Sequence, residues 1–128
     1  MNKILLIITG SIAASRCKEI INLLHNKEVK ISCILTKEAK KYLKISDIKK
    51  LLKNRIFTDE DEKKNKMLHI NLSRDNDIIV MCPATANSIA KFANGYGDNL
   101  ASNTLLAANK KILFVPSCLL YTSPSPRD

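Results

Sequence analysis

The stretch DIIVMCPATANSIAK, residues 77–91, organises the interpretation of the whole chain. Its first part, Asp77–Cys82, is apolar after the aspartate and predicts a buried strand. Pro83 ends that strand because proline has no backbone N–H to give to the ladder. The residues from Thr85 to Asn94 then carry apolar side chains at helical spacing. Small residues at the junction would let a flat ligand approach the backbone, at the strand end where open α/β sheets bind cofactors.

The rest of the chain repeats this pattern of a strand followed by a helix. The predicted elements alternate at residues 3–9 (strand), 11–26 (helix), 29–35 (strand), 37–43 and 47–52 (helices), 99–108 (helix) and 111–116 (strand). Because strands and helices alternate at these intervals, we expect an α/β fold with right-handed βαβ units and a parallel sheet. The charged run Thr58–Lys66 has no periodicity, and we expect it to be an exposed, mobile loop without chemistry of its own.

Composition places the chain among single-domain globular proteins. Its 128 residues are 45% hydrophobic, and no run approaches the roughly 20 apolar residues that a membrane span needs. The apolar N-terminal run is short and leads into an amphipathic segment, so it predicts a first strand rather than a signal peptide. We therefore expect an intracellular, cytoplasmic protein. The net charge of +9 includes lysines scattered between Lys27 and Lys66 without interleaved aromatics, which favours a solvated basic face over a nucleic-acid site.

The four cysteines do not form a metal-binding pattern. Cys17, Cys33, Cys82 and Cys118 show neither CxxC pairing nor zinc spacing. Cys33 and Cys82 fall inside predicted strands, which indicates buried thiols in a reducing compartment. The acidic cluster in Thr58–Lys66 has no second set of ligands near it, so no metal site is predicted.

A second junction of strand and helix occurs at Gly10-Ser11-Ile12. Gly10 permits a tight turn and Ser11 is a candidate N-cap, so free N–H groups and the helix dipole would favour a phosphate there. A single glycine is not the GxGxxG pattern, and an ordinary turn between strand and helix is the alternative. Thr36 ends the next strand, and its hydroxyl either reaches the same phosphate or only caps the following helix. His69 lies between apolar residues and is either a packed core histidine or a titratable group in a pocket.

Several blocks of the chain resemble a known family. In chain order they are GSIAA at 10–14, LT at 35–36, LHINL at 68–72, PATANSIAK at 83–91, Gly95 and DNL at 98–100. Over roughly residues 3–116 their order and spacing are similar to those of the flavin-dependent cysteine decarboxylases. Within that family the resemblance is strongest to the phosphopantothenoylcysteine decarboxylases of coenzyme A synthesis.

The resemblance implies a Rossmann-like (flavodoxin-like) three-layer fold of the flavoprotein type, with FMN bound between the subunits of a homotrimer or dodecamer. It also implies a role for His69 as the catalytic histidine, near the flavin and the substrate carboxylate. The cofactor-binding residues carried over from the family are Gly10, Ser11, Ile12 and Thr36 at the FMN phosphate and ribityl chain, and Ala84, Thr85, Ala86 and Asn87 around the rest of the flavin.

The activity that the resemblance implies is decarboxylation of 4′-phosphopantothenoylcysteine to 4′-phosphopantetheine, with FMN taking up and returning a hydride equivalent. In many bacterial relatives a phosphopantothenate–cysteine ligase domain follows this one, so a fusion or partnership with that ligase is expected. Two alternatives stay open. One is another enzyme of the superfamily, such as a flavin prenyltransferase or a peptidyl-cysteine decarboxylase, although the LHINL segment argues against these. The other is a non-catalytic, FMN-binding regulatory subunit.

The C-terminal residues depart from the family pattern. Where the family continues with Pro-Ala-Met-Asn, this chain has Pro116-Ser117-Cys118-Leu119, and it has no counterpart of the family's flap cysteine. We therefore expect an FMN-binding domain at residues 1–116 that is truncated at its C-terminus, followed by a non-native or disordered tail at residues 117–128. The sequence leaves open whether the chain as given catalyses decarboxylation. Cys118 is assigned no catalytic role, because it lies in the tail.

Overall fold

The computed structural model describes residues 2–10, 12–25, 27–84, 86, 89–90 and 99–116. These residues contain a five-stranded sheet in the order β3-β2-β1-β4-β5, and each neighbouring pair is parallel. The predicted α/β fold with a parallel sheet is therefore confirmed. The strands are β1 (Asn2–Ile8), β2 (Val29–Leu35), β3 (Ile56–Phe57), β4 (Ile78–Ala84) and β5 (Lys111–Pro116).

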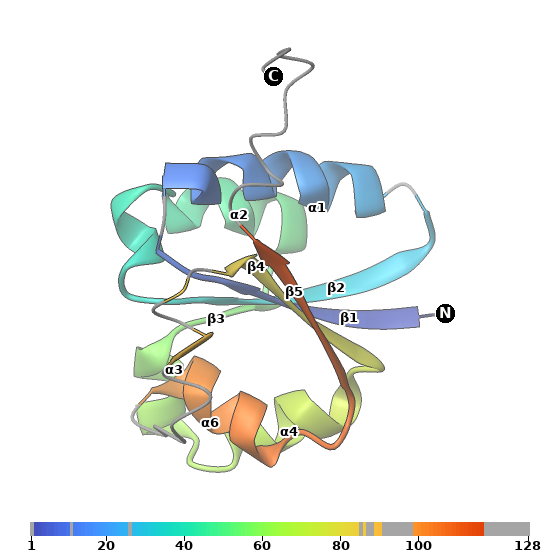
Figure 1. Ribbon diagram of the computed structural model, residues 1–128, viewed down its shortest axis with the longest axis vertical. Coiled ribbons are helices and arrows are strands. Elements are labelled where there is room, and N and C mark those ends of the chain that lie inside the picture. The colour runs from blue at the N-terminus through green and yellow to red at the C-terminus, as the bar shows by residue number, and fades with distance from the viewer. Residues whose placement is uncertain are drawn as a thin grey trace.

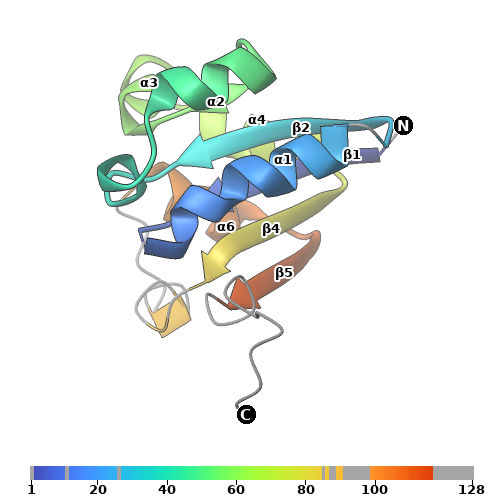
Figure 2. The ribbon, with the colours of Figure 1, turned by 90° about the horizontal axis from the view of Figure 1, so that it is seen from above.

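Helices cover both faces of the sheet and give the fold three layers (Figure 1). One face carries the 3-10 turns η1 (Ile12–Arg16) and η2 (Ala39–Lys41) with the helices α1 (Cys17–His25) and α2 (Ile45–Leu52). The opposite face carries α3 (Asp59–Lys64), α4 (Leu68–Asp75) and α6 (Leu100–Ala107). Figure 2 shows α1 lying along the strands, which fan out through the twist of the sheet.

The alternation of side chains along β1 explains why residues 4–8 of this strand are all apolar. Leu6 and Ile8 are buried with the core on the α1 and α2 side, whereas Leu5 and Ile7 are buried with the core on the α4 and α6 side. A strand covered on both faces must present apolar side chains to both. Each fully buried aliphatic side chain contributes about 1.5–3 kcal/mol relative to an exposed one, so β1 is central to stability.

The strand order places a topological switch point between β1 and β4. The connection that leaves β1 passes over the face of α1, whereas the one that leaves β4 returns to β5 through α6 on the opposite face. The two strands pair directly, with Ile7 opposite Met81. The carboxyl ends of strands on either side of such a point form the crevice where open α/β sheets bind ligands. The two junctions singled out in the sequence are those that follow β1 and β4.

The segment Thr58–Lys66, predicted to be a mobile loop, is instead largely helical. Residues 59–64 form α3, and a capping box joins Thr58 to Asp61 at its start. The backbone N–H of Thr58 donates to Oδ2 of Asp61 over 2.9 Å. The prediction of a loop was wrong because it relied on the absence of apolar periodicity. The sequence does carry a helix-start signal, a threonine followed three positions later by an acidic residue.

Parts of the predicted pattern fall outside the described residues. Of the helix predicted at residues 85–94, only Ala86, Ile89 and Ala90 are described, and all three are helical. The predicted tail at residues 117–128 is also outside them. Among the residues that are described, no helix is long and apolar enough to cross a membrane.

Candidate functional site

The ends of β1 and β2 are joined by Thr36. Its hydroxyl donates to the carbonyl oxygen of Ile8 over 3.0 Å and accepts from the backbone N–H of Ala39 over 3.3 Å. The backbone N–H of Thr36 also donates to Ile8, over 3.1 Å. Thr36 is buried, and its hydroxyl proton is already engaged. The structure thus supports the capping role that the sequence left as one alternative, and Thr36 still lies beside the end of β1.

Gly10 follows β1 in close contact with the turn after β2. A Cβ at this position would collide with Cβ of Glu38 and would lie 3.1 Å from the carbonyl carbon of the same residue. The close approach of the two chain segments therefore requires a residue without a side chain. Gly10 itself is half-buried, so its backbone is accessible at the edge of the sheet.

The other predicted flavin-binding residues are only partly described. Ile12 begins η1, and Ala84 ends β4 as a buried residue on the α4 and α6 side. Ala86 is helical and exposed. Ser11, Thr85 and Asn87 lie outside the described residues. The structure thus brings Gly10, Thr36 and Ala84 to the carboxyl ends of three adjacent strands.

Beneath this edge, two cysteine side chains meet in the core. Sγ of Cys17 donates to the carbonyl oxygen of Cys82 over 3.3 Å and lies 3.7 Å from its Sγ. The hydrogen bond with Cys82 and burial raise the pKa of the Cys17 thiol, and burial alone raises the pKa of Cys33. Cys17, Cys33 and Cys82 are free and buried, which confirms the predicted buried thiols. The raised pKa values of Cys17 and Cys33 indicate structural thiols that stay protonated.

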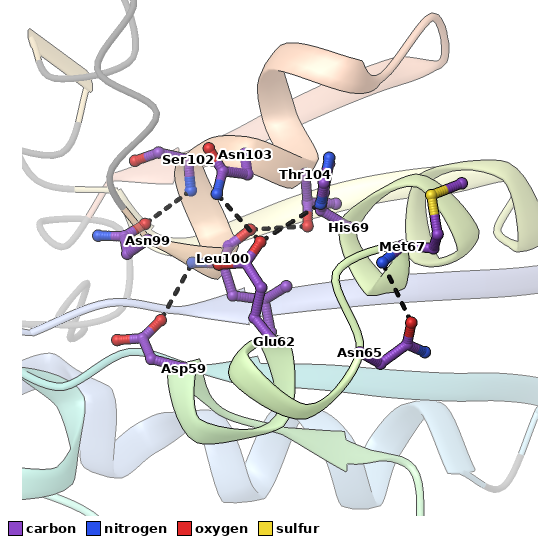
Figure 3. Close-up of polar contacts among 10 residues, drawn as sticks. All are labelled: Asp59, Glu62, Asn65, Met67, His69, Asn99, Leu100, Ser102, Asn103 and Thr104. Atoms are coloured by element: carbon purple, nitrogen blue, oxygen red, sulfur yellow. Dashed lines mark hydrogen bonds and ion pairs between the residues drawn. The ribbon is translucent and has the colours of Figure 1, made fainter.

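His69 lies in the first turn of α4, and Nδ1 of its imidazole faces Glu62 of α3 (Figure 3). The nitrogen is 3.3 Å from Oε2 of Glu62, which is within ion-pair distance, although it makes no hydrogen bond. Nδ1 is buried, while the side chain as a whole is 27% exposed. α4 follows α3 and leads into β4, and it lies on the same face of the sheet as α3 and α6 (Figure 1). His69 is not a fully packed core histidine.

Contacts between α3 and α6 fix Glu62. Its Oε2 accepts a hydrogen bond of 3.0 Å from Nδ2 of Asn103, and Oδ1 of Asp59 accepts one of 3.0 Å from the backbone N–H of Leu100 (Figure 3). Asn99 caps α6 by accepting from the backbone N–H of Ser102 over 2.8 Å. The sequence alone predicts no chemistry for the acidic cluster in Thr58–Lys66. The spacing of Glu62 and His69 in the sequence does not indicate their contact, because that contact requires helix α3, which the sequence pattern does not predict.

An open groove adjoins this cluster. It has a volume of about 660 Å³, and its lining carries equal numbers of basic and acidic side chains together with Asn99. Lys40 and Glu60 form an ion pair of 3.6 Å across part of it. Among the described residues, no group of three or more histidine, cysteine or acidic side chains could hold a metal ion.

The strand order and the two junctions together define a Rossmann-like α/β protein with a topological switch point between β1 and β4. The family described as Flavoprotein matches residues 1–127, and the chain belongs to this family. The family match supports a flavin as the cofactor.

Relatives of known name resemble the chain in sequence. The chain is 33% identical to Protein SIS2 of Candida tropicalis over 89% of its own length and 24% of the relative. It is 28% identical to the coenzyme A biosynthesis bifunctional protein CoaBC of Bacillus subtilis, covering 96% of this chain and 31% of the relative. It is also 29% identical to a probable phosphopantothenoylcysteine decarboxylase of Streptococcus mutans, covering 95% of this chain and 72% of the relative. The chain thus spans less than a third of the first two relatives.

Solved structures of cysteine decarboxylases have a similar fold. A cysteine-to-serine mutant of PPC decarboxylase, complexed with pantothenoylaminoethenethiol, superposes with a TM-score of 0.77 at 27% identity, covering 96% of this chain and 71% of that one. The FMN-dependent cysteine decarboxylase SpaF superposes with a TM-score of 0.83 at 26% identity, covering 97% of this chain and 74% of that one. The Rossmann-like flavoprotein fold and the resemblance to phosphopantothenoylcysteine decarboxylases are therefore confirmed.

Proposed function

We propose that this chain is the FMN-binding domain of a phosphopantothenoylcysteine decarboxylase, which converts 4′-phosphopantothenoylcysteine to 4′-phosphopantetheine in coenzyme A biosynthesis. The observation that supports this most is the direct pairing of β1 with β4 at the switch point of the sheet, which brings the two junctions that follow these strands to one edge. Family membership and the decarboxylase relatives support the same activity.

The residues present at this edge fit a flavin. Gly10 has no side chain and is half-buried, and Ala84 contributes a single methyl group at the end of β4. The partly exposed backbone of Gly10 is where a phosphate would approach, whereas the buried Ala84 would only form the floor beneath the ring. Gly10, Ser11, Ile12 and Thr36 would hold the phosphate and ribityl chain. Ala84, Thr85, Ala86 and Asn87 would hold the remainder, with the amide of Asn87 offering both a donor and an acceptor.

The catalytic group of this chain is His69. When bound, FMN supplies a two-electron acceptor that returns the hydride equivalent after carbon dioxide is lost. His69 orients the substrate carboxylate or exchanges a proton at its imidazole, because its side chain is partly exposed while Nδ1 is fixed against Glu62. The protein's contribution is to bind and orient, and the redox chemistry belongs to the cofactor.

The remaining features of the proposal concern assembly. The FMN-binding domain comprises residues 1–116, and the protein acts in the cytoplasm as a homotrimer or dodecamer. A phosphopantothenate–cysteine ligase is its fusion partner or functional partner, which is supported by the bifunctional relative CoaBC. A second candidate, an FMN-binding regulatory subunit without catalysis, is favoured by the sequence Pro116-Ser117-Cys118-Leu119, which departs from the decarboxylase pattern.

The test begins with the 128-residue chain and a titration of FMN, followed by flavin fluorescence. We expect saturable binding and a yellow protein. The holoprotein is then given 4′-phosphopantothenoylcysteine, and 4′-phosphopantetheine and carbon dioxide are measured. His69→Ala should keep FMN affinity and lose product. Binding without turnover in the parent chain would favour the regulatory subunit, whereas failure to bind FMN would refute both candidates.

A further inference from the structure

One carboxylate oxygen links His69 to a second helix. Oε2 of Glu62 lies 3.3 Å from Nδ1 of His69 and accepts a hydrogen bond of 3.0 Å from Nδ2 of Asn103 (Figure 3). An ionised carboxylate can only accept hydrogen bonds. A lone pair on Nδ1 would therefore face the lone pairs of Oε2, whereas a proton on Nδ1 is attracted to them. The arrangement is favourable only when Nδ1 carries the proton.

We propose that Glu62 is a positioning residue for His69, which keeps the imidazole proton on Nδ1 and so presents Nε2 as the nitrogen that meets the substrate. The part of this inference that concerns the contact of Nε2 with the substrate rests on the proposed function. The part that concerns the tautomer of the imidazole does not. In the neutral imidazole, Nε2 then carries the lone pair and can accept a proton. In the protonated ring, Nε2 offers an N–H to an anionic group, while Glu62 balances the positive charge.

Burial supports this assignment of the two nitrogens. Nδ1 is enclosed, yet the His69 side chain is 27% exposed, so its accessible surface belongs to the other atoms of the side chain. The Glu62 side chain is only 19% exposed, and partial exclusion of water strengthens its interaction with the ring. The separation of 3.3 Å is longer than the about 2.7–2.9 Å of a charge-assisted hydrogen bond. Such contacts are often long before substrate binds and shorten in the complex.

The scaffold around Glu62 gives it a fixed place. The helix α3 is capped at its start by Thr58 and Asp61. It is tied to α6 through Asp59 and the N–H of Leu100, and again through Glu62 and Asn103. The carboxylate is therefore held from two sides before it meets His69, as expected of a group that orients another side chain.

A purely structural role would make Glu62 only a link between α3 and α6. The two roles differ in what they do to the imidazole, because a structural link leaves its tautomer unchanged. The tautomer can be read from the ¹⁵N chemical shifts of labelled histidine in the 128-residue chain, with or without FMN. The chain has two histidines, and the variant His25→Asn identifies the signals of His69.

The parent chain should show the Nδ1–H form of His69, and Glu62→Ala should return the ring to the Nε2–H form that free histidine prefers. Glu62→Gln should retain the Nδ1–H form, because an amide oxygen still accepts, but it lacks the charge. Its kcat for decarboxylation should fall by about tenfold or more, because a positioning partner contributes less than the roughly 100- to 10,000-fold of the acid–base group itself, and FMN affinity should be unchanged. Asn103→Ala should shift the tautomer equilibrium in the direction of Glu62→Ala, to a smaller extent.

Glu60→Gln is the matched control, since Glu60 lies on the same helix and pairs with Lys40 instead of His69. This variant should keep both tautomer and kcat. An Nε2–H form in the parent chain, an unchanged tautomer in a folded Glu62→Ala variant, or a parental kcat in Glu62→Gln would each overturn the inference. If Glu62→Ala does not fold, the tautomer of the parent chain and the kcat of Glu62→Gln still test the inference. A tautomer that follows Glu62 in a chain without decarboxylase activity would refute the proposed function and leave the positioning role intact.

Discussion

The hydroxyl of Thr36 donates a hydrogen bond of 3.0 Å to the carbonyl oxygen of Ile8, joining the carboxyl ends of β2 and β1 beside the candidate flavin site. The same hydroxyl accepts from the N–H of Ala39. Thr36→Val keeps the shape of the side chain and removes both bonds. We expect a loss of about 1–2 kcal/mol in the free energy of unfolding, measured by urea denaturation.

Thr36→Ser is the control for that experiment, because serine keeps the hydroxyl and loses only a methyl group. It should retain most of the stability that valine loses. Equal losses in the two variants would mean that the buried methyl group, rather than the hydrogen bonds, holds the two strand ends together.

Gly10→Ala should destabilise the fold because the new Cβ meets Cβ of Glu38. The expected cost is about 1–3 kcal/mol, typical of overpacking. Glu38→Gly removes the opposing atom, so the double variant should be more stable than the sum of the single changes predicts. If the changes in the free energy of unfolding were strictly additive in urea denaturation, Gly10 and Glu38 would not be in steric contact. Flavin affinity, measured on the same variants, should fall with Gly10→Ala.

The strands of the sheet were largely predictable because burial on both faces leaves a strong apolar signal. Val29–Leu35 and Lys111–Pro116 were predicted with the bounds of β2 and β5. The two-residue strand β3 was missed, since Ile56–Phe57 is too short to carry a pattern. Helix α3 was missed for a different reason. It buries no side chain completely and is stabilised by capping and by polar contacts with distant residues, so it has little apolar periodicity.

The candidate site was predictable to the extent that it follows from topology. Small residues after two strands indicated the edge of the sheet, and the strand order places those strands side by side. The partner of His69 could not be inferred in the same way. Glu62 lies seven positions earlier in the chain, and its contact depends on how α3 packs against α4 and α6. Pairs of polar residues on separate helices leave no periodic trace in a single sequence.

The link between α3 and α6 gives a third prediction. The backbone N–H of Leu100 opens α6 and donates to Oδ1 of Asp59, and Leu100 is fully buried. Asp59→Ala leaves this N–H without its acceptor at the positive end of the helix, so unfolding should become easier by about 1–3 kcal/mol. Asp59→Asn retains an oxygen at the same place and should lose less. If both variants were as stable as the parent, α3 would not be anchored through Asp59.

The buried thiols predict how stability depends on pH. Burial raises the pKa of Cys33 above its ordinary value, so the native chain keeps a proton that the unfolded chain releases as the pH rises. The stabilisation is complete below the unfolded thiol pKa of about 8.5 and is lost above it, by up to about 1.4 kcal/mol per pH unit for one thiol. Cys33→Ala removes this contribution, so its free energy of unfolding should fall less steeply than that of the parent in alkaline urea titrations. The comparison concerns slopes, because the alanine variant also loses packing at every pH. Parallel slopes for the two proteins would show that Cys33 ionises equally in the folded and unfolded chains.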